Sequence, residues 1–351
     1  MTDDRTGGLG GAVDWDVAAR TGVRLVRSGP RITREEAERV VDDLADASIR
    51  AEGPVRDVTG LADGLPVPQA RIVDRSGWIR AASASMAHLT GDDTPGRTGL
   101  LGGRPAGVQA GAMLAFLSSA ILGQYDPFTG DNGTLLLVAP NVVSVERTLR
   151  VRPSDFRLWV CLHEVTHRVQ FSSSPWLTGY MQESVETLGS AEDESVTDMV
   201  GRLSSALRDR GRTEPDESGA PGGIVGLLRA TQAEPQREAL DRLLVLGTLL
   251  EGHADHVMDA VGPAVVPSVA AIRAAFDQRR RRKSNPVQRL VRALLGMDAK
   301  MAQYVRGKAF VDAVVDKVGM DRFNVVWTGP DTLPRLAEID APDAWVSRVL
   351  G

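Results

Sequence analysis

The chain has 351 residues, of which 42% are hydrophobic and 25% are charged, the composition of an ordinary globular protein that can bury a full core. Its 41 basic and 46 acidic side chains give a formal net charge of −5, which excludes a general electrostatic attraction to nucleic acid or to an anionic membrane. One cysteine cannot form an internal disulfide, so the fold does not depend on an oxidising compartment.

The N-terminal residues 1–13 are acidic and rich in glycine, and they lack the basic start and apolar run of a secretory signal. We expect them to form a disordered tail of a cytoplasmic protein, followed by a single domain over residues 14–351. The most apolar segment, Val108 to Leu122, is shorter than the about 20 residues needed to span a bilayer, so we predict a buried helix there. Gly107, Gly111 and Ala115 would let another helix approach it closely.

Between residues 33 and 138 the pattern predicts a helix, two strands and the loops that join them. Thr33 and Glu36 fit a capping box, and apolar residues then recur at helical spacing, so we predict a helix over Thr33 to Glu52. The segments rich in turn residues, which we expect to be loops, are Gly53 to Pro68 and Thr90 to Pro105. The runs of strand-forming residues are Arg71 to Val73 and, after a turn at Asp131-Asn132-Gly133, Thr134 to Val138.

The segment Leu158 to Phe171, LWVCLHEVTHRVQF, contains His163, Glu164 and His167 in the order H-E-x-x-H. Its apolar residues recur at spacings of three and four without Gly or Pro, so we predict a helix. Residues four apart lie on one face of a helix, so the two imidazoles can bind one metal ion and Glu164 can reach a water on that metal. The alternative is a pair of surface histidines on an ordinary helix.

Two neighbours of this motif bear on the site. Cys161 lies two residues before His163, about 200° around a helix, so we expect a buried small hydrophobe that points away from the metal. The strand Thr134 to Val138 is either an edge strand, with which an extended peptide could pair, or a core strand. The sequence favours neither interpretation.

After the motif, the pattern alternates between loops and helices. We expect loops at residues 172–180 and 210–223, an acidic helix over Met181 to Asp209, and a long helix over Gln236 to Asp259. The basic run Arg279 to Lys283 lacks interleaved aromatic residues, so we expect a solvated turn and no nucleic-acid partner.

The long helix carries a second cluster of metal-binding residue types, LLEGHADHVMDAVG. A catalytic zinc site with two histidines normally takes a third protein ligand and keeps one position for water. Glu251 is the first choice, because a carboxylate with two imidazoles is a familiar catalytic set, and Asp255, His253 and His256 are the alternatives. Those that are not ligands could orient a ligand imidazole or stabilise an oxyanion, a role that Tyr304 could also fill.

The chain resembles a zincin-like family known as actinobacterial zinc-dependent metalloproteases or hydrolases, some of whose members are named for an association with deazaflavin-coenzyme biosynthesis genes. The resemblance implies an α+β fold that is predominantly α-helical, a zincin-like metalloprotease fold with a small sheet beside the HExxH helix. It further implies an N-terminal lobe over about 14–171 with that helix and a helical C-terminal lobe over about 172–351 that supplies the third ligand. The segments that carry the resemblance are residues 15–30, 162–171, 251–263 and 315–321.

The leading hypothesis is a zinc metallopeptidase that hydrolyses peptide bonds. Zn²⁺ would lower the pKa of its water to around 7 and polarise the substrate carbonyl, and Glu164 would act first as general base and then as general acid. A second hypothesis is a zinc hydrolase of a non-peptide amide or small metabolite. A third is a zinc-stabilised interaction protein without turnover, in which protein ligands close the coordination sphere.

Overall fold

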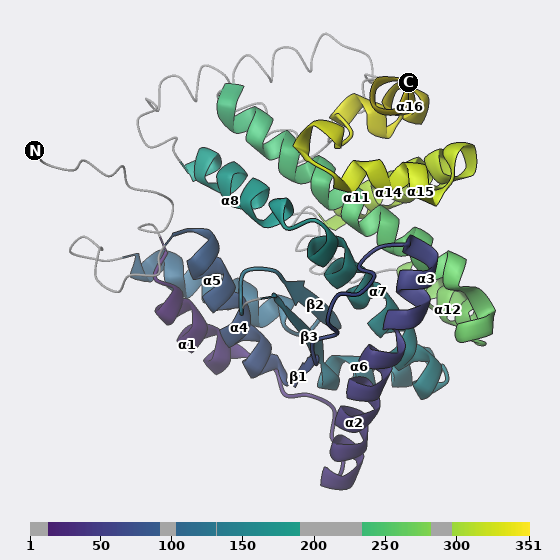
Figure 1. The fold of residues 1–351 in the computed structure, drawn as a ribbon. Helices are drawn as coiled ribbons and strands as arrows, with labels where there is room; N and C mark the ends of the chain where they lie inside the picture. Colours follow the sequence, from purple (N-terminus) through teal and green to yellow (C-terminus); the bar gives the residue numbers. More distant parts are fainter. Residues whose placement is uncertain (1–12, 92–102, 131, 190–233, 282–296) are drawn as a thin grey trace, which may run out of the picture. The chain divides into compact units, whose positions relative to one another are not determined.

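The computed structural model describes residues 13–91, 103–130, 132–189, 234–281 and 297–351 (Figure 1). The chain divides into two compact units. The first, here called the N-terminal unit, comprises residues 1–178 together with 257–281, and the second, the C-terminal unit, comprises residues 179–256 together with 282–351.

Most elements lie wholly within one unit, and two long helices are shared. Helix α8 (Trp176–Gly189) and helix α11 (Glu234–Val265) each run through a boundary between the units. The N-terminal unit contains α1 (Trp15–Leu25), α2 (Arg34–Arg50), α3 (Glu52–Thr59), β1 (Arg71–Val73), α4 (Arg75–Leu89), α5 (Arg104–Leu117), β2 (Gly123–Asp126), β3 (Thr134–Val138), α6 (Ala139–Leu149), α7 (Pro153–Ser173) and α12 (Val269–Arg281). The C-terminal unit contains α14 (Met297–Val318), α15 (Met320–Phe323), α16 (Pro342–Leu350) and the 3₁₀ helices η3 (Asn324–Trp327), η4 (Pro330–Thr332) and η5 (Leu336–Ile339).

A small mixed sheet with the order β1-β3-β2 lies in the N-terminal unit. Strand β1 pairs parallel to β3 and β2 pairs antiparallel to it, so Thr134 to Val138 is the central strand. Leu135 and Leu137 belong to one hydrophobic cluster, and Leu136 and Val138 belong to another. Burial on both faces explains the unbroken apolar run. The core-strand interpretation is confirmed, and the edge-strand interpretation of this segment is wrong.

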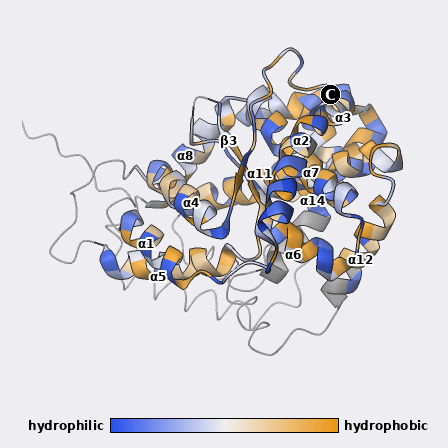
Figure 2. Cartoon of the chain, turned by 90° about the horizontal axis from the view of Figure 1, so that it is seen from below, coloured by the Kyte–Doolittle hydropathy of each residue, from blue (hydrophilic) through white to orange (hydrophobic). Residues whose placement is uncertain are grey.

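Helix α5 packs against α1 through glycines, and the two helices lie side by side in both views (Figures 1 and 2). A Cβ atom on Gly111 would lie 2.4 Å from the carbonyl oxygen of Ala18, and one on Gly107 would lie 2.5 Å from that of Asp14. The predicted close approach is therefore confirmed. The predicted burial is wrong for part of the helix, which ends at Leu117 and leaves three large side chains about half exposed, Val108, Met113 and Phe116.

The predicted helix over Thr33 to Glu52 is confirmed as α2, with the Thr33 hydroxyl accepting a hydrogen bond from the Glu36 amide at 3.1 Å. Two predicted loops are wrong in part, because α3 occupies residues 52–59 and α8 begins at Trp176. Proline is tolerated in the first turn of a helix, where its missing N–H has no intrahelical partner, so Pro54 and Pro175 stand near helix starts and do not interrupt helices.

The remaining expectations fall partly outside the described residues. Arg279 to Arg281 end α12 and are not a turn, whereas Arg282 and Lys283 lie outside. Arg104 and Pro105 open α5, which shortens the predicted loop before it. The predicted acidic helix over Met181 to Asp209 is described only as far as Gly189, and that part belongs to α8. Most of the predicted loop Thr90 to Pro105, the predicted tail apart from Val13, and the predicted loop over residues 210–223 lie outside the described residues. No helix within the described ranges is long and apolar enough to cross a membrane.

Within the C-terminal unit, α11 and α14 meet at small residues. A Cβ atom on Gly307 would lie 2.1 Å from the carbonyl oxygen of Thr248, and one on Gly252 would lie 2.2 Å from the Gly307 backbone. The predicted long helix is thus confirmed as part of α11, whose backbone kinks at Gly262.

Candidate metal centre

Helix α7 carries the HExxH motif and is held within the N-terminal unit by buried ion pairs on either side of the motif. Arg157 donates two hydrogen bonds to Glu146 at 3.1 and 2.8 Å, and Arg168 pairs with Glu52. These arginines and glutamates are all buried. Breaking one partner of such a pair leaves an uncompensated buried charge, so the pairs fix the position of the helix that presents the histidines.

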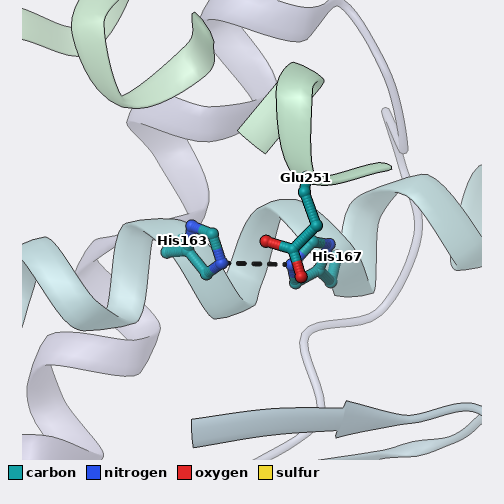
Figure 3. A group of neighbouring side chains, drawn as sticks. All are labelled: His163, His167 and Glu251. Atoms are coloured by element: carbon teal, nitrogen blue, oxygen red, sulfur yellow. Dashed lines mark hydrogen bonds between the residues drawn. The ribbon is translucent and has the colours of Figure 1, made fainter. Parts of the chain in front are cut away.

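His163 and His167 stand one turn apart on α7 with their rings facing each other edge to face at 88°. Their Nε2 atoms are 3.2 Å apart, the interaction drawn as a dashed line in Figure 3. Two nitrogen atoms bound at about 2.05 Å to a tetrahedral zinc ion lie about 3.3 Å apart. The separation of the two nitrogen atoms therefore matches the separation that zinc requires.

Gln170 fixes the tautomer of His167. The Nδ1 atom of His167 lies 2.9 Å from the Gln170 side-chain oxygen, which can only accept, so Nδ1 carries the proton and Nε2 keeps its lone pair for a metal. Gln170 is fully buried. Sequence reasoning missed this residue, although its position three residues after His167 on the same helix face could have revealed it.

Glu164 is 7% exposed and lies against the first residue of strand β2. A Cβ atom on Gly123 would come within 2.6 Å of the Glu164 Cγ and 2.9 Å of its Oε1. Glycine at this position therefore leaves the space that the carboxylate occupies. Sequence reasoning missed both Gly123 and its strand, because the segment GQYD contains few strand-forming residues.

Glu251, the first choice for a third ligand, forms a group with the two histidines that could hold a metal ion. One potential ligand atom from each of His163, His167 and Glu251 lies within 4.8 Å of the others, and all three residues are partly buried (Figure 3). Two imidazoles and one carboxylate form a donor set that suits a catalytic zinc ion. Asp255, one turn further along α11, is not part of this group.

The other predicted residues of the second cluster have different surroundings. His253 is fully buried, and its ring stacks on Phe323 at 5.5 Å and meets Trp327 at 5.2 Å between centroids. His256 lies with its Nδ1 2.7 Å from Asp312, which also pairs with Lys308. The side chain of Tyr304 lies outside the described residues, although its backbone belongs to α14.

Asp312 shows how this network is balanced electrostatically. Burial raises the pKa of the Asp312 carboxyl, but hydrogen bonds from Lys308 and His256 outweigh burial and leave that pKa below its usual range. The carboxylate is therefore ionised at neutral pH and holds the His256 ring in one orientation.

Cys161 faces away from the histidines, as predicted. It is fully buried, with its Sγ 3.8 Å from the Leu44 carbonyl oxygen, and burial raises the pKa of its thiol. A buried thiol with a raised pKa is a poor metal ligand, so Cys161 acts as a small core residue.

Comparison with known proteins places the chain in a family. The model of the Zincin-like metallopeptidase family matches residues 13–346, and the chain therefore belongs to that family. The predicted fold class, mostly helical α+β with a small sheet, is confirmed. Membership supports a hydrolase that uses a metal ion, usually zinc.

A solved structure from Chloroflexus aurantiacus, described as a candidate hydrolase with a novel fold, is similar to this chain with a TM-score of 0.66 and 29% identity. The similarity covers 96% of this chain and 98% of that one. No curated protein matches the sequence.

Proposed function

We propose that the protein is a zinc-dependent metallopeptidase, in which His163, His167 and Glu251 hold the metal and Glu164 is the general base. The observation that carries the proposal is the grouping of these three ligand atoms next to a buried glutamate on the same helix as the histidines. Membership in the Zincin-like metallopeptidase family supports the reaction class.

Zinc bound there would supply a Lewis acid that lowers the pKa of a water molecule to about 7 and polarises the scissile carbonyl. Glu164 accepts the proton of the attacking water and delivers it to the leaving nitrogen. Gln170 holds His167 in the tautomer that offers Nε2, and Gly123 leaves room for the Glu164 carboxylate.

The substrate in this proposal is an extended peptide bound along strand β2. Among the described strands, β2 pairs with β3 on one side only, and its first residue, Gly123, lies against Glu164. A peptide that pairs with an edge strand gains main-chain hydrogen bonds and is held extended. Pairing at this end of β2 would bring a peptide carbonyl toward the base.

Hydrolysis of a diverse peptide library by wild type, Glu164→Gln and Glu238→Gln tests the assignment. Glu238 is an exposed glutamate on α11, so its replacement makes the same chemical change far along the helix from the cluster. We expect Glu164→Gln to retain zinc and to lose peptide cleavage by about 100-fold or more, because general base catalysis contributes that much. We expect Glu238→Gln to cleave at the wild-type rate.

Equal cleavage by Glu164→Gln and wild type would contradict the proposed base. Zinc-loaded wild type that cleaves small non-peptide amides but no peptide would replace the metallopeptidase with a hydrolase of small substrates. Zinc-loaded wild type without any turnover would indicate an interaction protein.

A further inference from the structure

A pocket of about 510 Å³ lies in the N-terminal unit between helices α1 and α4, which pack against each other. Its α1 side is built from residues 16, 19, 20, 23 and 24, and its α4 side from residues 80, 83, 84 and 87. Both sets follow the helical spacing of three and four residues, so each helix turns one face toward the pocket. None of the residues that line the pocket belongs to α7.

Three arginines line this pocket, Arg20 and Arg24 on α1 and Arg80 on α4, and all three are exposed. Within the described parts of the chain, none of the three makes a hydrogen bond or an ion pair. In contrast, Arg157 and Arg168 of the same unit are paired with carboxylates. With Asp16 as its one lining acid, the pocket carries a formal charge of 3 − 1 = +2.

Ser83 supplies a second, independent observation. It lines the pocket, it is 3% exposed, and its buried Oγ has no hydrogen-bond partner among the described residues. Buried polar groups in proteins are almost always hydrogen-bonded, to protein, to water or to a ligand. A hydroxyl donor without a partner beside three cations is suited to an anion.

The rest of the lining is apolar and small. Ala19, Val23, Ala84 and Ala87 leave space between the helices, and the Trp15 ring lies at the same pocket. The indole Nε1 of Trp15 donates to the Thr90 hydroxyl at 3.1 Å, which fixes the ring. A fixed aromatic ring and small apolar side chains provide a surface for the uncharged part of an organic ligand.

We propose that this pocket binds a small anion with two or more phosphate groups, whose organic part contacts Trp15 and the alanines. Guanidinium groups bind phosphate oxygens through paired hydrogen bonds, and three of them match the several oxygens of a polyphosphate. The volume lies in the range of small-molecule sites. The proposal rests on residues of α1 and α4 and is independent of the metal centre.

Isothermal titration of the full-length, zinc-loaded protein with inorganic pyrophosphate and with adenosine triphosphate tests the site. We expect both to bind, adenosine triphosphate more tightly, and Arg24→Ala and Arg80→Ala each to weaken binding by about tenfold or more. The matched control is Arg34→Ala, which removes one exposed arginine of α2 and the same charge. All these variants keep His163, His167 and Glu251, so any contribution from zinc is equal in them.

Ser83→Ala separates a built site from general charge attraction, because it removes one donor without changing the charge. We expect severalfold weaker binding and an unchanged melting temperature. The proposal is overturned if neither probe binds, if Arg34→Ala weakens binding as much as Arg24→Ala, or if Ser83→Ala binds like wild type. Binding to vesicles of phosphatidylcholine and phosphatidylserine without binding to either soluble probe would also overturn it, in favour of a lipid surface.

Discussion

Gly123 has no side chain, yet it decides how much room the proposed base has. The Glu164 carboxylate fills the space where a Cβ atom of residue 123 would stand. Gln170 acts in a similar indirect way by fixing the tautomer of His167. Gly123 and Gln170 therefore position the reacting groups without reacting themselves. Neither glycine nor glutamine is a residue type that suggests catalysis.

Among individual residues, the sequence predicts those whose role depends on neighbours in the chain. His163, Glu164 and His167 could be found because their chemistry requires a fixed spacing on one helix. Glu251 could be named because carboxylates are frequent partners of two histidines, but the spacing of residues along the chain could not choose it over Asp255. Gly123 could not be found, because its role depends on a strand that the sequence does not reveal.

Gly123→Ala is predicted to displace the Glu164 carboxylate while leaving the histidines in place. A misplacement of about 1 Å costs on the order of 100-fold in rate, so we expect kcat for peptide hydrolysis to fall toward that extent with KM and zinc content little changed. Steady-state kinetics and elemental analysis measure these quantities.

Gly179→Ala is the matched control, because nothing lies within 4 Å of a Cβ atom on that helical glycine. It should retain full activity. An unchanged kcat in Gly123→Ala would show that the space beside Glu164 is not needed.

Among the elements, α2, α7 and β3 follow from their sequences, whereas the starts of α3 and α8 do not. The run of strand-forming residues Thr134 to Val138 predicts a strand. Its central position follows from pairing with both β1 and β2, and its burial follows from α2 and α7 on one face and α4 and α5 on the other. Pro54 and Pro175 suggest breaks, but the first turn of a helix accepts proline. The place of a strand in the sheet therefore depends on its neighbouring elements, and the start of a helix at a proline depends on backbone geometry. Composition predicts neither.

The contact between α1 and α5 should be sensitive to one methyl group. Gly111→Ala places a Cβ atom 2.4 Å from the Ala18 carbonyl oxygen, so the helices must separate, and overpacking of this kind costs about 1–3 kcal/mol. Urea denaturation should show the lower stability.

Gly247→Ala adds the same methyl group to the interior of α11, where nothing lies within 4 Å. It should raise the stability by about 0.5–1 kcal/mol, because alanine favours the helix more than glycine does. Equal effects of the two substitutions would contradict close packing at Gly111.

For the whole molecule, the composition and the charge of −5 predict an ordinary globular protein and say nothing about its division into two units. That division follows from contacts between residues far apart in the chain, such as Ser268 with Asp155, whose carboxylate accepts two hydrogen bonds from it at 3.0 and 2.7 Å. Residues 257–281 thereby belong with the N-terminal unit although they follow most of α11.

Helix α11 runs through a boundary between the two units and carries Glu251, the third ligand of the proposed metal centre. Met258 is buried in the core of the N-terminal unit, and Glu251 lies two helical turns before it on the same face. The proposed zinc site takes its two histidines from α7 and its glutamate from α11. Replacing the Glu251 carboxylate should remove the metal, whereas replacing Asp255 should not.

Zinc content by elemental analysis of wild type, Glu251→Gln and Asp255→Asn tests this claim most directly. Both substitutions turn a carboxylate of α11 into an amide of the same size. We expect about one zinc ion per chain in wild type and in Asp255→Asn, and little zinc in Glu251→Gln, because a catalytic site needs its third protein ligand. Full zinc in Glu251→Gln, or no zinc in wild type, would contradict the proposed metal centre.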